Sequence, residues 1–90
     1  MFTIPRVNVI QSDDGFSFEV LGRTGVRYVE HGKTMHIDSE VLAGPRALVL
    51  YASSITKWDD GEDVDAEAKQ RIAENARAAF RFRGMEIEVL

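Results

Sequence analysis

Acidic side chains gather at one place in this sequence, directly after its only tryptophan. Residues 53–72 read SSITKWDDGEDVDAEAKQRI. Six carboxylates fall within nine residues there, although the net charge of the whole 90-residue chain is only −4. They are Asp59, Asp60, Glu62, Asp63, Asp65 and Glu67. Carboxylates at this density can bind a cation, start a helix or attract a basic partner.

The spacing of these carboxylates does not match the helix–loop–helix calcium motif. That motif places oxygen ligands at alternate positions before its glycine. Counting from Asp59, the third position is Gly61, and no helical pattern precedes the loop. A calcium site of another kind stays open, but the sequence predicts no metal and no cofactor.

Two histidines, His31 and His36, are the other candidates for metal binding or acid–base chemistry. They fall on opposite arms of a predicted hairpin, and the chain has no cysteine. A zinc site needs further ligands, and a catalytic histidine needs an orienting acid such as Glu30 or Glu40. The sequence carries no nucleophile motif and no phosphate-binding glycine loop. We therefore expect ordinary strand or surface histidines, and a protein that is not an enzyme.

The acidic block divides into two parts with different explanations. Asp65 stands at a predicted N-cap, and acids near a helix N-terminus interact favourably with the helix dipole. The earlier acids lie too far before the helix to gain from it, and they repel one another. The sequence therefore predicts a helix start over residues 64–72 and a partner-binding surface before it. That predicted surface consists of Trp58, Asp59, Asp60, Glu62 and Asp63.

Two interpretations of Trp58 remain open. A tryptophan at a strand end often packs over one end of a core, whereas an exposed tryptophan serves as an anchor in many interfaces. The basic residues of the predicted helix are expected to form a solvated face, since no aromatic side chains alternate with them as in nucleic-acid sites. They are Lys69, Arg71, Arg77, Arg81 and Arg83.

The elements that must position these residues can be predicted from periodicity. Residues 2–10 and 16–22 indicate a hairpin with Gly15 in its turn, and Pro5 suggests that the first strand lies at a sheet edge. A second hairpin, VRYVEHGKTMHID, is predicted to turn at Gly32-Lys33. LAGPR then breaks the chain before a predicted central strand at 47–52, which is apolar on both faces.

After Trp58 the period changes to that of a helix. The predicted apolar stripe consists of Ala68, Ile72, Ala76, Ala79 and Phe80. Gly84 is placed to end the helix, and MEIEVL alternates as a closing strand. We predict a single domain over residues 1–90 of the α+β class. It has a largely antiparallel sheet of about five or six strands, one C-terminal helix of roughly 18 residues on one face, and a short closing strand.

Composition limits the location and partners of this domain. The chain is 44% hydrophobic and 29% charged, as in globular proteins, and its longest apolar run is far too short for a membrane span. Because there is no cysteine and no signal-peptide pattern at the start, a cytoplasmic location is expected. The negative net charge argues against nucleic acid as a partner. Outside the acidic block the chain sums to about +2.

From about Tyr28 to its end, the chain resembles a family of small immunity proteins from bacterial polymorphic toxin systems, the family numbered seventy-four. The resemblance rests on SEVLAG, LVLYASSI, the Trp58-Asp59 pair, RIAENARAAF and GMEIEV, in this order. Asp60-Gly61 occupies the region where that family commonly carries a proline. None of these elements is a catalytic signature.

The resemblance implies a non-enzymatic protein that binds a cognate toxin and protects its producer. An acidic surface would suit a basic toxin, which is an inference from charge alone. The alternative is a structural or adaptor module that self-associates through a sheet edge or an uncovered sheet face, with no toxin partner. A homodimer is compatible with either interpretation.

Overall fold

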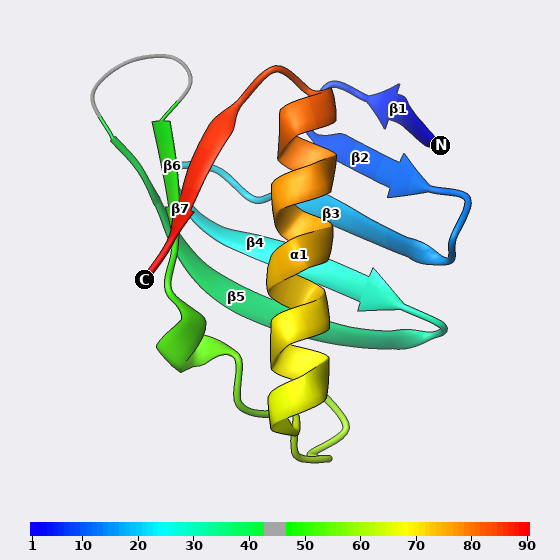
Figure 1. Cartoon of the computed structure of the whole chain (residues 1–90), viewed down its shortest axis with the longest axis vertical. Helices are drawn as coiled ribbons and strands as arrows, with labels where there is room; N and C mark the ends of the chain where they lie inside the picture. The colour runs from blue at the N-terminus through cyan, green and yellow to red at the C-terminus, as the bar shows by residue number, and fades with distance from the viewer. Residues whose placement is uncertain (43–46) are drawn as a thin grey trace.

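The computed structural model of the protein describes residues 1–42 and 47–90, and these form one sheet with a helix across one of its faces (Figure 1). The predicted α+β class is confirmed, including the largely antiparallel sheet, the C-terminal helix and the closing strand. The elements are β1 (Phe2–Arg6), β2 (Val9–Ser12), β3 (Phe16–Val20), β4 (Thr24–Glu30), β5 (Lys33–Val41), β6 (Ala47–Leu50), the 3-10 turn η1 (Ala52–Ser54), α1 (Ala66–Phe82) and β7 (Glu86–Val89). The strands lie side by side in sequence order.

The sheet has seven strands because the predicted first strand is in fact two. Arg6 pairs with Val9, which leaves residues 7–8 as a tight turn between β1 and β2. Asn8 fixes this turn, since its side-chain amide donates to the carbonyl of Val20 at 3.1 Å. The strand that contains Pro5 lies at the sheet edge, as predicted.

The second predicted hairpin forms with its turn shifted by one residue, and in the first hairpin the arm that pairs with β3 is β2 (Val9–Ser12) instead of residues 2–10. Gly15 has φ +96° in the β2–β3 turn, the conformation expected of glycine there. In the second hairpin Glu30 pairs with Lys33, so the turn is made by residues 31–32 and lies one residue before the predicted Gly32-Lys33. His31 and Gly32 both take positive φ, as a two-residue turn of type I′ requires.

The predicted central strand 47–52 is shorter and lies nearer one edge of the sheet. It forms β6, which pairs antiparallel with β5 and parallel with β7, while β4 holds the middle of the sheet. Leu48, Val49 and Leu50 are all buried, in agreement with the prediction of a strand covered on both faces. The predicted break LAGPR lies mostly in residues 43–46, outside the described residues.

The helix begins and ends at the predicted signals. The Asp65 carboxylate accepts a hydrogen bond from the backbone N–H of Ala68 at 2.7 Å, which caps the N-terminus. Gly84 has φ +87° after the last turn, and Met85 N–H donates to the carbonyl of Phe80 at 2.8 Å. Among the described residues, no helix is both long and apolar enough to cross a bilayer.

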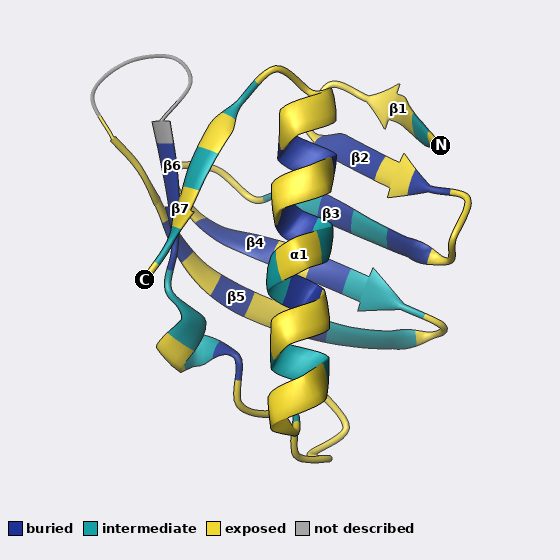
Figure 2. Ribbon diagram, viewed as in Figure 1, coloured by how far each residue is buried: buried dark blue, intermediate teal, exposed yellow. Residues whose placement is uncertain are grey.

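The core lies between the helix and the sheet face that it covers (Figure 2). Ile72, Ala76, Ala79 and Phe80 are buried on the inner side of α1, which confirms most of the predicted stripe. From the sheet, aromatic rings on adjacent strands meet the helix. The largest fully buried side chains include Tyr28, Phe18, Phe80, Met35 and Ile37. This layer fixes the position of the segment between β6 and α1.

Candidate partner-binding surface

The segment from Lys57 to Asp63, called the acidic loop below, is a small hydrogen-bonded hairpin. Lys57 and Asp63 form an antiparallel bridge, and Trp58 N–H donates to the carbonyl of Glu62 at 2.9 Å. Beyond the bridge, Val64 N–H donates to the carbonyl of Thr56 at 2.9 Å. The loop therefore presents its acids from a defined backbone.

Gly61 closes the tip of the acidic loop. Its N–H donates to the carbonyl of Trp58 at 2.9 Å, and its φ is +90°, a conformation that a proline cannot adopt. Asp60 supports the turn by accepting from the backbone N–H of Glu62 at 2.9 Å. The Asp60-Gly61 pair thus forms an ordered turn.

Trp58 anchors the acidic loop to the core. It is only 6% exposed and belongs to the same cluster of buried side chains as Phe18 and Tyr28. Its ring centroid lies 6.1 Å from that of Tyr28, and Lys33 Nζ lies 5.6 Å from the ring on its outer side. Of the two interpretations, the structure therefore supports packing over one end of the core.

The acids of the loop are exposed, and several are held by residues of β5. Lys33 Nζ lies 2.6 Å from a carboxylate oxygen of Glu62 and 3.6 Å from one of Asp60. Thr34 donates its hydroxyl proton to Asp59 at 2.6 Å, and Asp59 N–H donates to the carbonyl of Thr34 at 2.8 Å. These contacts tie the loop to the start of β5, a link that sequence reasoning missed.

Charge pairing on the acidic loop is incomplete. Lys57 Nζ lies 2.8 Å from Asp63, whose pKa is lowered by this hydrogen bond and by the positive charge. The Glu62 carboxylate accepts a hydrogen bond from Lys33 and attracts its charge, which raises the pKa of Lys33. Four carboxylates from Asp59 to Asp63 thus face two lysines, and the surface keeps a net negative charge. The structure brings all five predicted site residues into one loop, with Trp58 inside and the acids outside.

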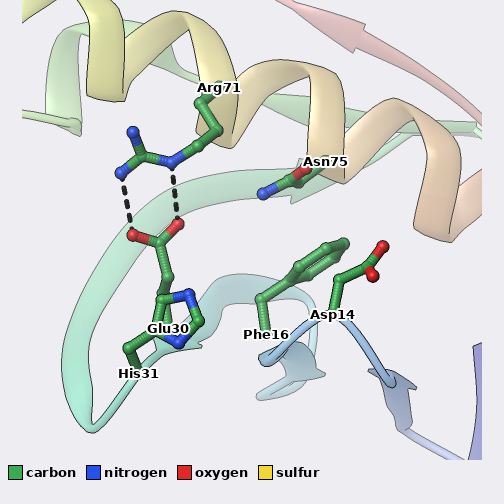
Figure 3. A pocket seen from close by; sticks show the side chains of 6 residues that line it. All are labelled: Asp14, Phe16, Glu30, His31, Arg71 and Asn75. Carbon is green, nitrogen blue, oxygen red and sulfur yellow. Dashed lines mark hydrogen bonds and ion pairs between the residues drawn. The ribbon is translucent and has the colours of Figure 1, made fainter.

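A second hydrogen-bonded cluster, with Glu30 as its one carboxylate, lies at the end of β4, across the β4–β5 turn from Lys33. Arg71 of α1 donates two hydrogen bonds to Glu30, from Nε at 3.0 Å and from Nη2 at 2.8 Å (Figure 3). The buried Tyr28 hydroxyl donates to Glu30 at 2.6 Å and accepts from the Asn75 amide at 3.1 Å. The helix face predicted to be solvated therefore has one arginine fixed to the sheet.

Burial and hydrogen bonding act in opposite directions on this cluster. Burial raises the pKa of Glu30, but hydrogen bonds from Arg71 and Tyr28 and the arginine charge outweigh it and hold the pKa below its usual value. Burial, together with the hydrogen bond to Glu30, raises the pKa of Tyr28 well above its usual range. Glu30 is therefore a charged structural group that holds the helix to β4.

The two histidines are not brought together. The His31 ring packs where a side chain on Gly15 would stand, and the His36 ring packs in the same way on Gly25. Within residues 1–42 and 47–90, no three side chains of the types that bind metals converge on one point. Ser54, at the end of η1, donates its hydroxyl proton to the carbonyl of Tyr51 at 2.6 Å.

Comparison with known proteins identifies the family of this chain. A search of curated proteins and a search of solved structures each found no match. The model of one protein family, described as Immunity protein 74, matches residues 19–90. The match starts before the resemblance that is visible from Tyr28, within β3, and includes β4, the acidic loop and α1. On this match, the chain belongs to the Immunity protein 74 family.

Proposed function

We propose that this protein binds a cognate toxin and neutralises it in the cytoplasm of the producing cell. Family membership supports the general role, since it describes an immunity protein. The acidic loop supports a specific surface for that role. Its acids are exposed at 54% for Asp60, 66% for Glu62 and 83% for Asp63, so a partner can reach all three.

The observation that carries the proposal is the contrast inside the acidic loop between a buried tryptophan at its base and exposed acids at its surface, whose charge two lysines neutralise only in part. Trp58 is buried, and the backbone bonds of the hairpin hold the tip in one conformation. A preorganised surface binds at a lower entropic cost than a loop that must first become ordered. The remaining negative charge attracts a basic surface and speeds its association.

Inhibition by binding needs no chemistry from the inhibitor. The side chains most suited to catalysis are already engaged in the fold, since Glu30 is bonded to Arg71 and Tyr28, and Ser54 to Tyr51. We propose a non-enzymatic mechanism in which the acidic loop occupies a basic surface of the toxin. The partner is a protein, with no role for nucleic acid or a membrane.

The test of this function uses the toxin domain encoded beside the gene. Co-expression should restore growth of cells that make the toxin, and the two proteins should elute together in size-exclusion chromatography. If both proteins are folded but neither a complex nor rescue is observed, the proposal is wrong. Trp58→Ala is unsuitable as an interface variant because Trp58 belongs to the core.

Self-association remains the second candidate, because one observation favours it. β1 lies at the free edge of the sheet, and the nearby Phe82 is 51% exposed while its ring lies 5.5 Å from that of Phe2. Exposed apolar side chains beside a strand with one free edge can form the contact between two copies of the protein. Light scattering on the purified protein distinguishes a stable dimer from a monomer. Phe82→Glu should convert such a dimer to a monomer.

A further inference from the structure

An open pocket of about 470 Å³ lies where the two hairpin turns of β2–β3 and β4–β5 meet the helix (Figure 3). Three elements supply its walls, so it depends on the complete fold. The lining residues are Asp14, Phe16, Glu30, His31, Arg71 and Asn75. Its volume falls within the range of roughly 300–1,000 Å³ that is usual for ligand sites.

The walls of this pocket are preorganised. His31 N–H donates to the carbonyl of Gly15 at 3.1 Å, and a side chain on Gly15 would approach the His31 ring to 2.7 Å, so the two turns are packed tightly together. The Phe16 ring lies 5.9 Å from both Phe2 and Phe18, centroid to centroid. The backbone at Asp14 is held by its N–H, which donates to the Ser12 hydroxyl at 3.0 Å.

The charges that line the pocket do not cancel. Glu30 and Arg71 neutralise each other through two hydrogen bonds. Asp14 stands beside Phe16 on the other side of the pocket, and no described residue forms an ion pair with its carboxylate. The surplus is one negative charge beside an aromatic ring, which suits a cation with a flat face.

We propose that this pocket receives the guanidinium of an arginine side chain from the toxin. A guanidinium donates two parallel hydrogen bonds to a carboxylate and also stacks on an aromatic ring, whereas a lysine ammonium lacks the planar shape. Asp14 supplies the carboxylate, the small exposed part of the Phe16 side chain (Phe16 is 9% exposed) supplies an aromatic contact, and the Asn75 amide oxygen is a further acceptor, since the Asn75 nitrogen donates to Tyr28.

The pocket and the acidic loop are close enough to serve one partner. His31 lines the pocket, and Lys33, two residues later, pairs with Asp60 and Glu62 of the acidic loop. A standard interface covers about 800 Å² on each partner, with a few anchor side chains near its centre. The inference rests on the proposed function, since it assigns an anchor site beside the surface that this function uses.

The first experiment compares Asp14→Asn with Asp13→Asn. Both remove one charge from adjacent exposed residues. Only Asp14 lines the pocket, whereas the Asp13 carboxylate pairs with the terminal ammonium of Met1 at 2.7 Å. Calorimetry with the toxin domain should show a rise in Kd of about 10- to 100-fold for Asp14→Asn, as expected from loss of a charge-assisted pair, and a change within about 3-fold for Asp13→Asn. Equal Kd values for both variants and the wild type would overturn the pocket assignment while leaving toxin binding intact.

A second experiment does not depend on the toxin. The capped peptide acetyl-Gly-Arg-Gly-amide is titrated into isotope-labelled protein, with acetyl-Gly-Glu-Gly-amide as the control. Backbone NMR shifts at Asp14, Phe16 and His31 that appear only with the arginine peptide and vanish in Asp14→Asn would support the site. If no shifts occur at these residues, or if wild type and Asp14→Asn shift alike, the pocket does not bind a guanidinium in the proposed way. That conclusion would hold even if the toxin binds another surface of the protein. Failure of the toxin to bind wild type would contradict both the proposed function and the toxin as the source of the arginine, whereas the peptide titration would still decide whether the pocket binds a guanidinium.

Discussion

The two strands joined by the β4–β5 turn each contribute one residue to a charged cluster, Lys33 of β5 to the acidic loop and Glu30 of β4 to a single ion pair with Arg71. In the acidic loop, Lys33 contacts Asp60 and Glu62 at the surface, where water competes for every charge. Behind the turn, the Glu30 side chain is only 12% exposed and accepts hydrogen bonds from Arg71 and Tyr28. The residue types are alike, but their surroundings differ.

This difference in burial distinguishes charged groups that stabilise the fold from exposed charged groups that a partner can contact. Surface ion pairs contribute little to stability, because solvent screens them and ordering long side chains has an entropic cost. A carboxylate that is nearly buried must keep its donors, since losing them leaves a charge without solvation. The comparison therefore predicts that the Glu30–Arg71 cluster controls stability and that the exposed acids of the acidic loop control binding. Each prediction below tests one of these two regions.

The largest effect on stability is expected from Trp58→Ala, at the buried base of the acidic loop. Truncating a buried tryptophan removes apolar contacts and leaves a cavity, so the free energy of unfolding should fall by about 3–5 kcal/mol in urea denaturation. Trp58→Phe should lose much less. A loss under about 1 kcal/mol for the alanine variant would show that the ring does not pack as described.

Glu30→Gln should have the next largest effect. The amide keeps the shape of the side chain but leaves the Arg71 guanidinium without its counter-ion, and unfolding should become easier by about 1–3 kcal/mol. Glu62→Gln is the matched control, because it removes an exposed carboxylate from a lysine and should leave the urea midpoint unchanged. Equal losses in both variants would remove the distinction between the two clusters.

The pH dependence of stability sharpens the assignment of Glu30 and Tyr28. The folded pKa of Glu30 is below its ordinary value of 4.5, so its contribution is complete above that pH and is lost as the pH falls through the folded pKa. The folded pKa of Tyr28 is above its ordinary value of 10.0, so the unfolded state releases that proton first and stability falls as the pH rises past 10.0. Urea midpoints of Glu30→Gln and Tyr28→Phe should lack the acid and alkaline losses respectively. If the loss of stability at acid or alkaline pH persists unchanged in the corresponding variant, that loss is due to the titration of another group.

Asp65→Ala tests whether the acidic block is divided into a helix cap at Asp65 and a binding surface in the acidic loop. Removing the cap leaves a backbone N–H of α1 unpaired, and stability should fall by about 1 kcal/mol. Thermal unfolding measures this change, and Asp65→Asn should recover most of it because asparagine is also a good cap. A helix cap has no role in binding, so the affinity for the toxin should not change in either variant. A large loss of affinity would place Asp65 in the interface.

Features that depend on neighbouring residues were predictable from the sequence. The cap at Asp65, the helix end at Gly84 and the turn at Gly15 each follow from one residue type beside a periodic pattern. The turn at residues 7–8 contains no glycine or proline and was not recognised, so two strands were predicted as one.

Contacts between distant residues were not predictable in the same way. Glu30 and Arg71 are 41 positions apart, and nothing local in the sequence distinguishes Arg71 from the exposed arginines later in the same helix. The pairing of Lys33 with the acidic loop likewise depends on how β5 lies beside it. For the candidate surface, the sequence indicated which residues are acidic, and only the fold separates the buried Trp58 from the exposed acids.

The most direct test of the central claim measures the affinity of the toxin for the double variant Asp60→Asn/Glu62→Gln. The control is Glu86→Gln/Glu88→Gln, which removes two exposed acids from β7 and so matches the change in net charge. The account predicts that the acidic-loop variant unfolds like wild type but binds at least about 10-fold more weakly, while the β7 variant binds within about 3-fold of wild type. Equal affinities for both variants, in well-folded protein, would contradict the claim that the acidic loop contacts the toxin.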